Sequence, residues 1–433
     1  MFIMSKDMRG TKIPGWFEFY RIACPICNKS GGCMQNQEGD VVACIREVSD
    51  RPFSKNSSLP SYLHFLKGEK KRRKIDPSQA ASISGEKKLD EYTLNEVYQS
   101  LLELLKLDEE HYVHLTSKKR QLSDEQIRVR DYQSFPDKPW EAVKLLQQSL
   151  GRDEFKGIPG FFEAEGKYGK YWSISGMKGI LIPYRNLRKE IIGFQYRLDQ
   201  PPNDVKVQER KQGLRAVVKE QPNLVQFLYE GEILFEQRLD VGETVTVYSP
   251  ESSIQDTSDS ILGWVTLKKG NRYYWLSSAK KNKGASSGDP APIHVTTPTH
   301  RMTRLKTGEP LTSKKVWLTE GALKADISSD LVSMLMSKDQ LAAYGDTFIA
   351  LPGVNSWQMV LPILKEMGVE EINLCFDMDA VDNIYVKAIL MQCIKKLKEE
   401  KYHVNMVVWN SEHSKGIDDL LLSRKLPQFK RLF

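Results

Sequence analysis

Three carboxylates follow one short apolar segment of the sequence, INLCFDMDAVDN at residues 372–383. The apolar run ends at Phe376, and Asp377, Asp379 and Asp382 come directly after it. Like charges at such short separation repel one another unless a cation lies between them. The segment therefore predicts a cation site at the end of a buried strand.

A fourth acidic residue, Glu320, ends another predicted strand, KVWLTE at 315–320. From Thr312 onward, short apolar runs alternate with helical patterns, which predicts a parallel sheet with right-handed crossovers. Sites in such sheets form at the carboxyl ends of the strands, so Glu320, Asp377 and Asp379 are expected to meet there. Clusters of oxygen ligands favour Mg²⁺ or Mn²⁺. The alternative is that each acid only caps the following helix, which explains one acid per helix start but not all three.

Four cysteines lie close together near the start of the chain: Cys24, Cys27, Cys33 and Cys44. Their spacing is C-x2-C-x5-C-x10-C, and no histidine occurs before His64. Four thiolates at such spacing can hold one zinc ion in a tetrahedron. The alternatives are disulfides, which are rare in cytosolic proteins, and a redox C-x-x-C, around which no thioredoxin-like pattern is present.

The composition is that of a folded protein with several domains. The chain has 433 residues, 40% of them hydrophobic and 27% charged, and a net charge of +7 that permits a polyanionic partner. No apolar run approaches the roughly 20 residues that span a bilayer. The N-terminal stretch lacks the pattern of a signal peptide. These features predict a cytoplasmic protein without a membrane partner.

The acidic motifs resemble a known domain. A strand ending in Glu-Gly and a strand ending in Asp-x-Asp, within alternating strands and helices at 312–425, are similar to the Toprim domain of primases, topoisomerases and related nucleases. SKGIDDLLLS at 414–423 resembles the acidic element after the last Toprim strand, which adds Asp418 and Asp419 as further metal ligands. In the alternative interpretation, one of these two acids only caps a helix.

The first part of the chain resembles the zinc ribbon that opens primases and primase-like proteins of plasmids, phages and other mobile elements. The resemblance is carried by YRIACPIC, GGC and DVVACIR. Replicative primases usually have a histidine among the ligands and another spacing, so the mobile-element branch fits better. In this family the ribbon helps to engage a single-stranded template.

The middle of the chain is similar to the primase catalytic core. LTSKKRQLSDEQIRVRDYQSFP resembles its helical entry, with Ser123 and Gln126 as a predicted capping box, and GMKGILIPYRNLRKEIIGFQYRLD resembles a strand pair that directs basic residues toward nucleic acid. The resemblance implies that basic side chains contact template or nucleotide phosphates: Lys178, Arg185, Arg197, Lys283 and Lys324. Lysines and arginines on a solvated sheet face are the alternative.

Together these features predict a multidomain α/β protein. A zinc ribbon occupies 1–52, a basic flexible linker 53–90, a mixed α+β primase-like core 91–311, and a Toprim domain with a βαβ parallel sheet 312–433. The segment 203–265 matches no element of the family and is interpreted as an insertion.

The function that the resemblance implies is synthesis of short RNA primers on single-stranded DNA from ribonucleoside triphosphates by two-metal phosphoryl transfer. Glu320, Asp377 and Asp379 are the expected catalytic residues, with zinc as a structural cofactor and Mg²⁺ or Mn²⁺ as the catalytic one. The sequence has no G-x-x-x-x-G-K-[ST] motif, so a separate helicase or replication initiator is an expected partner. Two alternatives are a Toprim metal-dependent nuclease of a mobile element or defence system, and a non-catalytic DNA-binding recruiter.

Overall fold

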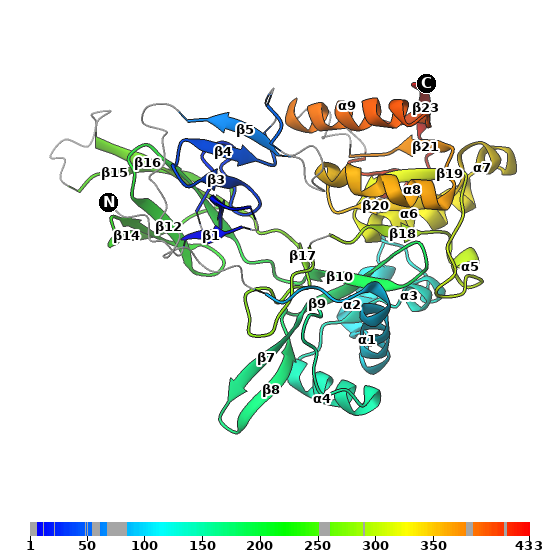
Figure 1. The fold of residues 1–433 in the computed structure, drawn as a ribbon, viewed down its shortest axis with the longest axis horizontal. Coiled ribbons are helices and arrows are strands. Elements are labelled where there is room, and N and C mark those ends of the chain that lie inside the picture. The colour runs from blue at the N-terminus through cyan, green and yellow to red at the C-terminus, as the bar shows by residue number, and fades with distance from the viewer. Residues whose placement is uncertain are drawn as a thin grey trace. The chain divides into compact units, whose positions relative to one another are not determined.

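Figure 1 shows the computed structural model of the chain. The structure describes residues 7–11, 13–20, 22–47, 49, 51–53, 61–66, 85–250, 260–288, 291–377, 384–410 and 414–433. The chain divides into two compact units. The first comprises Met1–Gly176, Leu181–Gln195 and Trp275–Phe433, and the second comprises Met177–Ile180 and Tyr196–Tyr274. No helix within the described ranges is long and apolar enough to cross a membrane.

A five-stranded antiparallel sheet carries the cysteines. Its strands follow chain order: β1 (Met8–Gly10), β2 (Trp16–Phe19), β3 (Met34–Asn36), β4 (Val41–Cys44) and β5 (Tyr62–Phe65). β5 pairs with β4, so the sheet continues into the segment 53–90 that the composition predicts to be a linker. Of that segment, 54–60 and 67–84 lie outside the described residues. Phe17, Phe19 and Val42 pack with the cysteines in a small core.

Helices and short strands make up the middle of the first unit. The elements are α1 (Glu91–Leu104), α2 (Glu109–Thr116), α3 (Asp124–Arg130), β6 (Gln133–Ser134), α4 (Pro139–Leu150), β7 (Phe161–Gly166) and β8 (Gly169–Ile174). Ser123 and Gln126 form the predicted capping box at the start of α3. β9 (Gly179–Arg185) and β10 (Ile191–Leu198) are the predicted strand pair and lie side by side in a sheet of order β17-β10-β9-β6, with β17 at Tyr273–Trp275.

A six-stranded sheet organises the C-terminal part. Its order is β18 (His294–Thr296), β20 (Thr347–Leu351), β19 (Lys315–Glu320), β21 (Glu371–Leu374), β22 (His403–Val408) and β23 (Gln428–Arg431). The four central strands are parallel, as the alternating pattern predicts, and β18 and β23 are antiparallel edge strands. The helical segments are α5 (Thr299–Met302), α6 (Ala322–Leu335), α7 (Lys338–Tyr344), the 3-10 helix η5 (Val354–Met359), α8 (Val360–Met367), α9 (Ile384–Glu399) and α10 (Ile417–Leu422).

Six strands lie wholly within the second unit, and its described residues include no α-helix. These are β11 (Asp204–Glu209), β12 (Leu214–Glu220), β13 (Leu224–Tyr229), β14 (Glu232–Arg238), β15 (Thr244–Tyr248) and β16 (Ile261–Lys268), in two sheets of order β11-β16-β15 and β12-β13-β14. Both sheets contribute to one hydrophobic cluster that includes Phe227 and Val265. The unit contains all of the described residues of 203–265, so the segment without a family counterpart has its own core.

Candidate functional site

The four cysteine sulfurs converge at one point of the first sheet. All lie within 4.8 Å of one another, and Cys33 Sγ lies 3.6 Å from the sulfurs of both Cys27 and Cys44. A disulfide requires about 2.05 Å. Four sulfurs at about 2.3 Å from a zinc ion form a tetrahedron with edges of about 3.8 Å. The measured separations therefore fit a zinc site made of four thiolates and not disulfides.

The backbone around the cluster supports the same interpretation. Asn28 N donates to Cys24 O at 2.8 Å, which closes a tight turn between the first two cysteines. Gly32 has a φ of +78°, and a Cβ there would lie 2.4 Å from Ile45 Cδ1, so the approach to Cys33 requires glycine. Backbone N–H groups of Arg46 and Glu47 donate to Cys44 Sγ at 3.4 and 3.3 Å. Such donors stabilise thiolates and orient metal ligands.

Glu320 and Asp377 come from neighbouring parallel strands. β19 pairs with β21 in a register that sets Leu318 opposite Leu374, so Glu320 and Asp377 both follow at the same sheet edge. Gly321, with a φ of +81°, turns the chain from β19 into α6. Glu320 Oε1 accepts a hydrogen bond from Val354 N at 3.0 Å. The sequence-predicted convergence of these two acids at the carboxyl ends is thus present in the structure.

A lysine ammonium lies among these acids. Lys324, in the first turn of α6, forms an ion pair with Asp377, and both side chains are largely shielded from water. Burial lowers the pKa of Lys324, but the carboxylates of Asp377, Asp418 and Glu320 raise it above its ordinary value. The ammonium therefore remains charged beside Asp377, at the strand end where the sequence predicts Mg²⁺ or Mn²⁺.

Asp418 joins the same edge from α10, whereas Asp419 has a local role. Asp418 is 5% exposed, its Oδ2 lies 3.2 Å from Arg120 Nη1, and burial raises its pKa although Lys324 opposes this. A Cβ on Gly416 would lie 2.5 Å from Asp418 Oδ1 and 3.2 Å from Lys324 Cε, so the glycine lets α10 approach the lysine. Asp419 Oδ2 accepts from Gly416 N at 3.3 Å, as a helix cap does.

The fit of this edge to a divalent cation is partial. Asp379 and Asp382 lie outside the described residues. Within the described ranges, the cysteine cluster is the only group of three or more ligand residues close enough to hold one ion. The carboxylate oxygens of Glu320, Asp377 and Asp418 are ligands that Mg²⁺ and Mn²⁺ accept. A divalent ion at Asp377 would compete with the Lys324 ammonium for the same oxygens.

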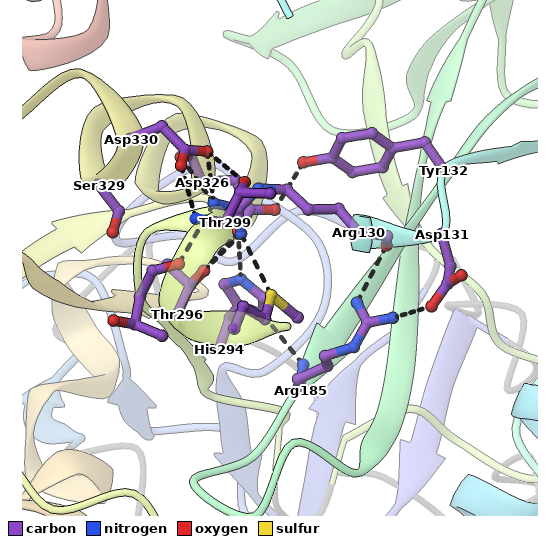
Figure 2. Close-up of polar contacts among 12 residues, drawn as sticks. Arg130, Asp131, Tyr132, Arg185, His294, Thr296, Thr299, Asp326, Ser329 and Asp330 are labelled. Atoms are coloured by element: carbon purple, nitrogen blue, oxygen red, sulfur yellow. Dashed lines mark hydrogen bonds and ion pairs between the residues drawn. The ribbon is translucent and has the colours of Figure 1, made fainter. Parts of the chain in front are cut away.

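A buried polar network lies on another side of α6 (Figure 2). Arg130 from the end of α3 is fully buried, and its Nη1 donates to Asp326 Oδ1 at 2.5 Å while its Nη2 donates to Asp330 Oδ2 at 2.7 Å. The Asp326 carboxylate accepts three further hydrogen bonds, from Tyr132 Oη at 2.5 Å, Thr296 Oγ1 at 2.7 Å and His294 Nε2 at 3.1 Å. The network joins α3, β18 and α6.

His294, the first residue of β18, has a hydrogen bond at each ring nitrogen, and these two bonds fix its tautomer. Arg185 N donates to His294 Nδ1 at 3.0 Å, so Nδ1 carries no proton and Nε2 donates to Asp326 Oδ1 at 3.1 Å. Burial alone would raise the pKa of Asp326, but Arg130 and His294 hold it well below its usual range. Asp326 is therefore an ionised carboxylate whose charge is balanced inside the protein.

Arg185 belongs to this network, and this placement differs from the predicted phosphate contact. Its side chain is 3% exposed, and the guanidinium donates to Asp131 Oδ2 at 2.6 Å and to Arg130 O at 3.0 Å (Figure 2). Burial lowers the pKa of Arg185 although Asp131 opposes this. A side chain so enclosed positions neighbouring elements and does not offer its charge to a polyanion.

The other predicted basic residues occupy different environments. Lys178 is exposed and Arg197 half-buried, both in the second unit. Lys283 Nζ lies 2.8 Å from Glu163 Oε1 and 2.9 Å from Glu154 Oε1, and these carboxylates raise its pKa. Lys324 points into the acidic edge. Of the five predicted basic residues, Lys178 is the only one in the exposed class.

The sequence reasoning does not include Arg130, Tyr132, His294 and Asp326. One signal was available: Asp326 and Asp330 are four residues apart in ALKADISSDLVSML, whose other residues apart from Lys324 are small or apolar, and so share one face. Their partners lie up to 200 residues away in the chain, and no local pattern identifies them.

Comparison with known proteins gives one family model and several solved structures. Residues 312–426 match the model described as a domain of unknown function, DUF3854. No curated protein matches the chain at the significance required. The family model covers the part of the chain that contains Glu320, Lys324, Asp377 and Asp418, and its description assigns no activity.

The solved structures are bacterial primases. The zinc-binding and RNA polymerase domains of the Aquifex aeolicus primase share 9% identity, with 97% of this chain and 81% of that chain covered and a TM-score of 0.40. The RNA polymerase domain of Mycobacterium tuberculosis primase DnaG, in complex with a double-stranded DNA with a 6-nucleotide overhang, shares 12% identity over 76% of each chain, with a TM-score of 0.40. A DnaG primase catalytic domain bound to single-stranded DNA shares 10% identity, with 78% of this chain and 80% of that chain covered and a TM-score of 0.38.

Proposed function

We propose that the protein is a primase-like nucleotidyltransferase that synthesises short RNA primers on single-stranded DNA from ribonucleoside triphosphates. One observation carries the proposal: Glu320, Asp377 and Asp418 come together with Lys324 at the carboxyl edge of a parallel sheet. Acids beside a charged lysine suit chemistry on phosphate groups, where positive charge must balance the anionic oxygens. The Toprim-like motifs and the four-cysteine cluster are consistent with it.

Each residue of the edge has a role in this proposal. Glu320, Asp377 and Asp379 would hold Mg²⁺ or Mn²⁺, with Asp418 as a further ligand, and the bound ions would stabilise charge on the attacking and leaving oxygens. Lys324 would exchange Asp377 for a phosphate oxygen when the triphosphate enters, because its ammonium remains charged. Asp377 is then released from its ion pair and becomes available as a ligand.

The remaining parts would bind the template. Lys178 and Arg197 would contact the phosphate backbone, and the four-cysteine cluster would hold zinc and keep the first sheet folded around it. We infer a cytoplasmic protein that works with a separate helicase or replication initiator. The motifs of the mobile-element branch favour a plasmid or phage as its source.

The test of the function is incubation of the full chain with single-stranded DNA, labelled ribonucleotides and Mg²⁺ or Mn²⁺. Short oligomers that require the template are expected. DNA shortened without any need for triphosphates would instead establish a nuclease, and binding without reaction would establish a recruiter.

The zinc site has its own measurement. Metal analysis of the purified protein should give about one zinc per chain, and Cys44→Ser should lower this value sharply, because three thiolates leave the tetrahedron incomplete. Cys393→Ser is the matched control, since Cys393 lies buried in α9 far from the cluster in sequence. Thiols paired as disulfides in the metal-free protein would contradict the site.

A further inference from the structure

A groove of about 440 Å³ lies between α4 and the hairpin β7–β8, inside the first unit. Figure 1 shows the hairpin beside α4 at the lower end of the view. The lining residues include three aromatic and two basic side chains: Trp140, Tyr171, Trp172, Lys144 and Lys170. None of them belongs to the acidic edge or to the cysteine cluster. The groove therefore needs its own explanation.

Two of its three aromatic side chains are exposed, whereas Trp172 is only 7% exposed. Trp140 is 48% exposed and Tyr171 43% exposed, whereas α4 buries Ala142, Val143 and Leu146 against the rest of the unit. Trp140 stands near the start of α4 after Pro139 and is not part of that buried face. Large rings that remain accessible in a hollow are typical of surfaces that stack against flat ligands.

The groove carries two lysines, Lys144 and Lys170, and two acids, Asp153 and Glu163. Lys144 is exposed, and the Lys170 side chain is 66% exposed. Glu163 is the acid closest to Lys170, at 3.4 Å, but Lys283 lies nearer to Glu163 at 2.8 Å and already balances its charge. An exposed pair such as Lys170–Glu163 contributes little, so Lys170 can exchange it for a phosphate.

We propose that this groove binds single-stranded nucleic acid, with one base stacked against Trp140 and Tyr171 and the flanking phosphates near Lys144 and Lys170. The identity of the ligand rests on the proposed function, in which a single-stranded template is the substrate. Aromatic stacking tolerates any base, and lysines on either side follow the backbone. The groove thus holds template without selecting its sequence.

The test is fluorescence anisotropy of a labelled oligothymidine with the full chain, without nucleotides. Trp140→Ala should weaken binding about 5- to 150-fold, the range expected for one stacked base. Trp140→Phe should retain most of the affinity, because a ring remains. Tyr92→Ala is the matched control, since Tyr92 is 73% exposed on α1 and lies outside the groove, and it should bind as the unmodified protein does.

A second measurement separates stacking from charge. Lys144→Gln and Lys170→Gln should each reduce the slope of log affinity against log salt by about 0.7, the value for one phosphate contact on a single strand. Trp140→Ala should leave this slope unchanged. An equal loss of affinity for duplex DNA in Trp140→Ala would overturn the inference, because bases inside a duplex cannot enter the groove.

The two proposals fail independently. If the unmodified protein makes primers and the Trp140→Ala variant binds oligothymidine normally, the proposed function stands and the proposed binding groove is disproved. If the unmodified protein makes no primers, but Trp140→Ala loses oligothymidine binding and Trp140→Phe keeps it, the proposed binding groove stands and the proposed function is disproved. An unmodified protein that does not bind single strands disproves the groove.

Discussion

Helix α6 carries two charged residues, Lys324 and Asp326, that the fold shields from water in different ways. They are two residues apart, so they point about 200° from each other around the helix. Asp326 lies in a network in which Arg130, Tyr132, Thr296 and His294 donate to it. Lys324 lies among acids that outnumber it, Asp377, Asp418 and Glu320.

The difference separates a structural charge from a functional one. A buried carboxylate with all its donors in place stabilises one arrangement of α3, β18 and α6 and has nothing left to offer a ligand. The Lys324 edge retains an excess of negative charge that a metal ion or a second cation can still lower. Three substitutions and one acid titration test this contrast.

Asp377→Asn should reduce primer synthesis by more than about 100-fold, the scale of losing one preorganised electrostatic contact. The free energy of unfolding should change little, because Lys324 keeps Asp418 and Glu320 as neighbouring acids. Asp339→Asn, an exposed acid near the start of α7, is the control and should remain fully active. Full activity of Asp377→Asn would remove Asp377 from the proposed site.

Asp326→Asn should lower the free energy of unfolding by about 3–5 kcal/mol, because it leaves the Arg130 guanidinium buried without its main counter-charge. Urea unfolding measures this. Glu366→Gln breaks the exposed pair with Arg188 and should cost at most about 1 kcal/mol. Equal losses for both substitutions would mean that burial of the network has no special energetic role.

Lys324→Met should make stability depend on divalent cations. Without the ammonium, the acids of the edge repel one another, and saturating Mn²⁺ should recover about 1–3 kcal/mol, more than in the unmodified protein. Thermal unfolding with and without Mn²⁺ measures the gain. Lys338→Met on the exposed start of α7 is the control. The same Mn²⁺ gain in both proteins would show that Lys324 does not neutralise the acidic edge.

The free energy of unfolding that the ionised Asp326 contributes should fall as the solution is made acidic. The pKa of Asp326 is lowered in the folded state, so its contribution is complete above the unfolded pKa of about 3.9 and is lost as the pH falls. At pH 3 the loss should be about 1 kcal/mol. The difference in unfolding free energy between the unmodified protein and Asp326→Asn should therefore shrink below about pH 4 and stay constant from about pH 6 to 8.

Much of the fold follows from local patterns. The strand ending at Glu320, the capping box of Ser123 and Gln126, and the parallel arrangement after residue 312 agree with the sequence predictions, whereas β21 ends at Leu374, three residues before Asp377. These features depend on residues a few positions apart, whose spacing sets the periodicity of a helix or strand directly. The cysteine spacing belongs to the same class, because short turns bring its ligands together.

Arg185 illustrates the limit of this reasoning. As the one basic residue at the end of the apolar strand GILIPYR, it is indistinguishable in the sequence from a phosphate-binding arginine, yet the structure encloses it between Asp131 and the carbonyl of Arg130. Burial depends on which distant segments pack over a side chain, and local periodicity does not contain that information.

Local sequence patterns are sufficient to predict the alternation of strands and helices, the cysteine cluster and the acids at or just after the ends of two strands. Only the tertiary structure decided that Lys324 lies among those acids, that Arg130 and Asp326, 196 residues apart, form one buried pair, and that Trp140 faces a groove with Tyr171. The physical reason is that propensities and spacing act along the chain, whereas the energy of a charge depends on the solvent and partners that the folded protein gives it.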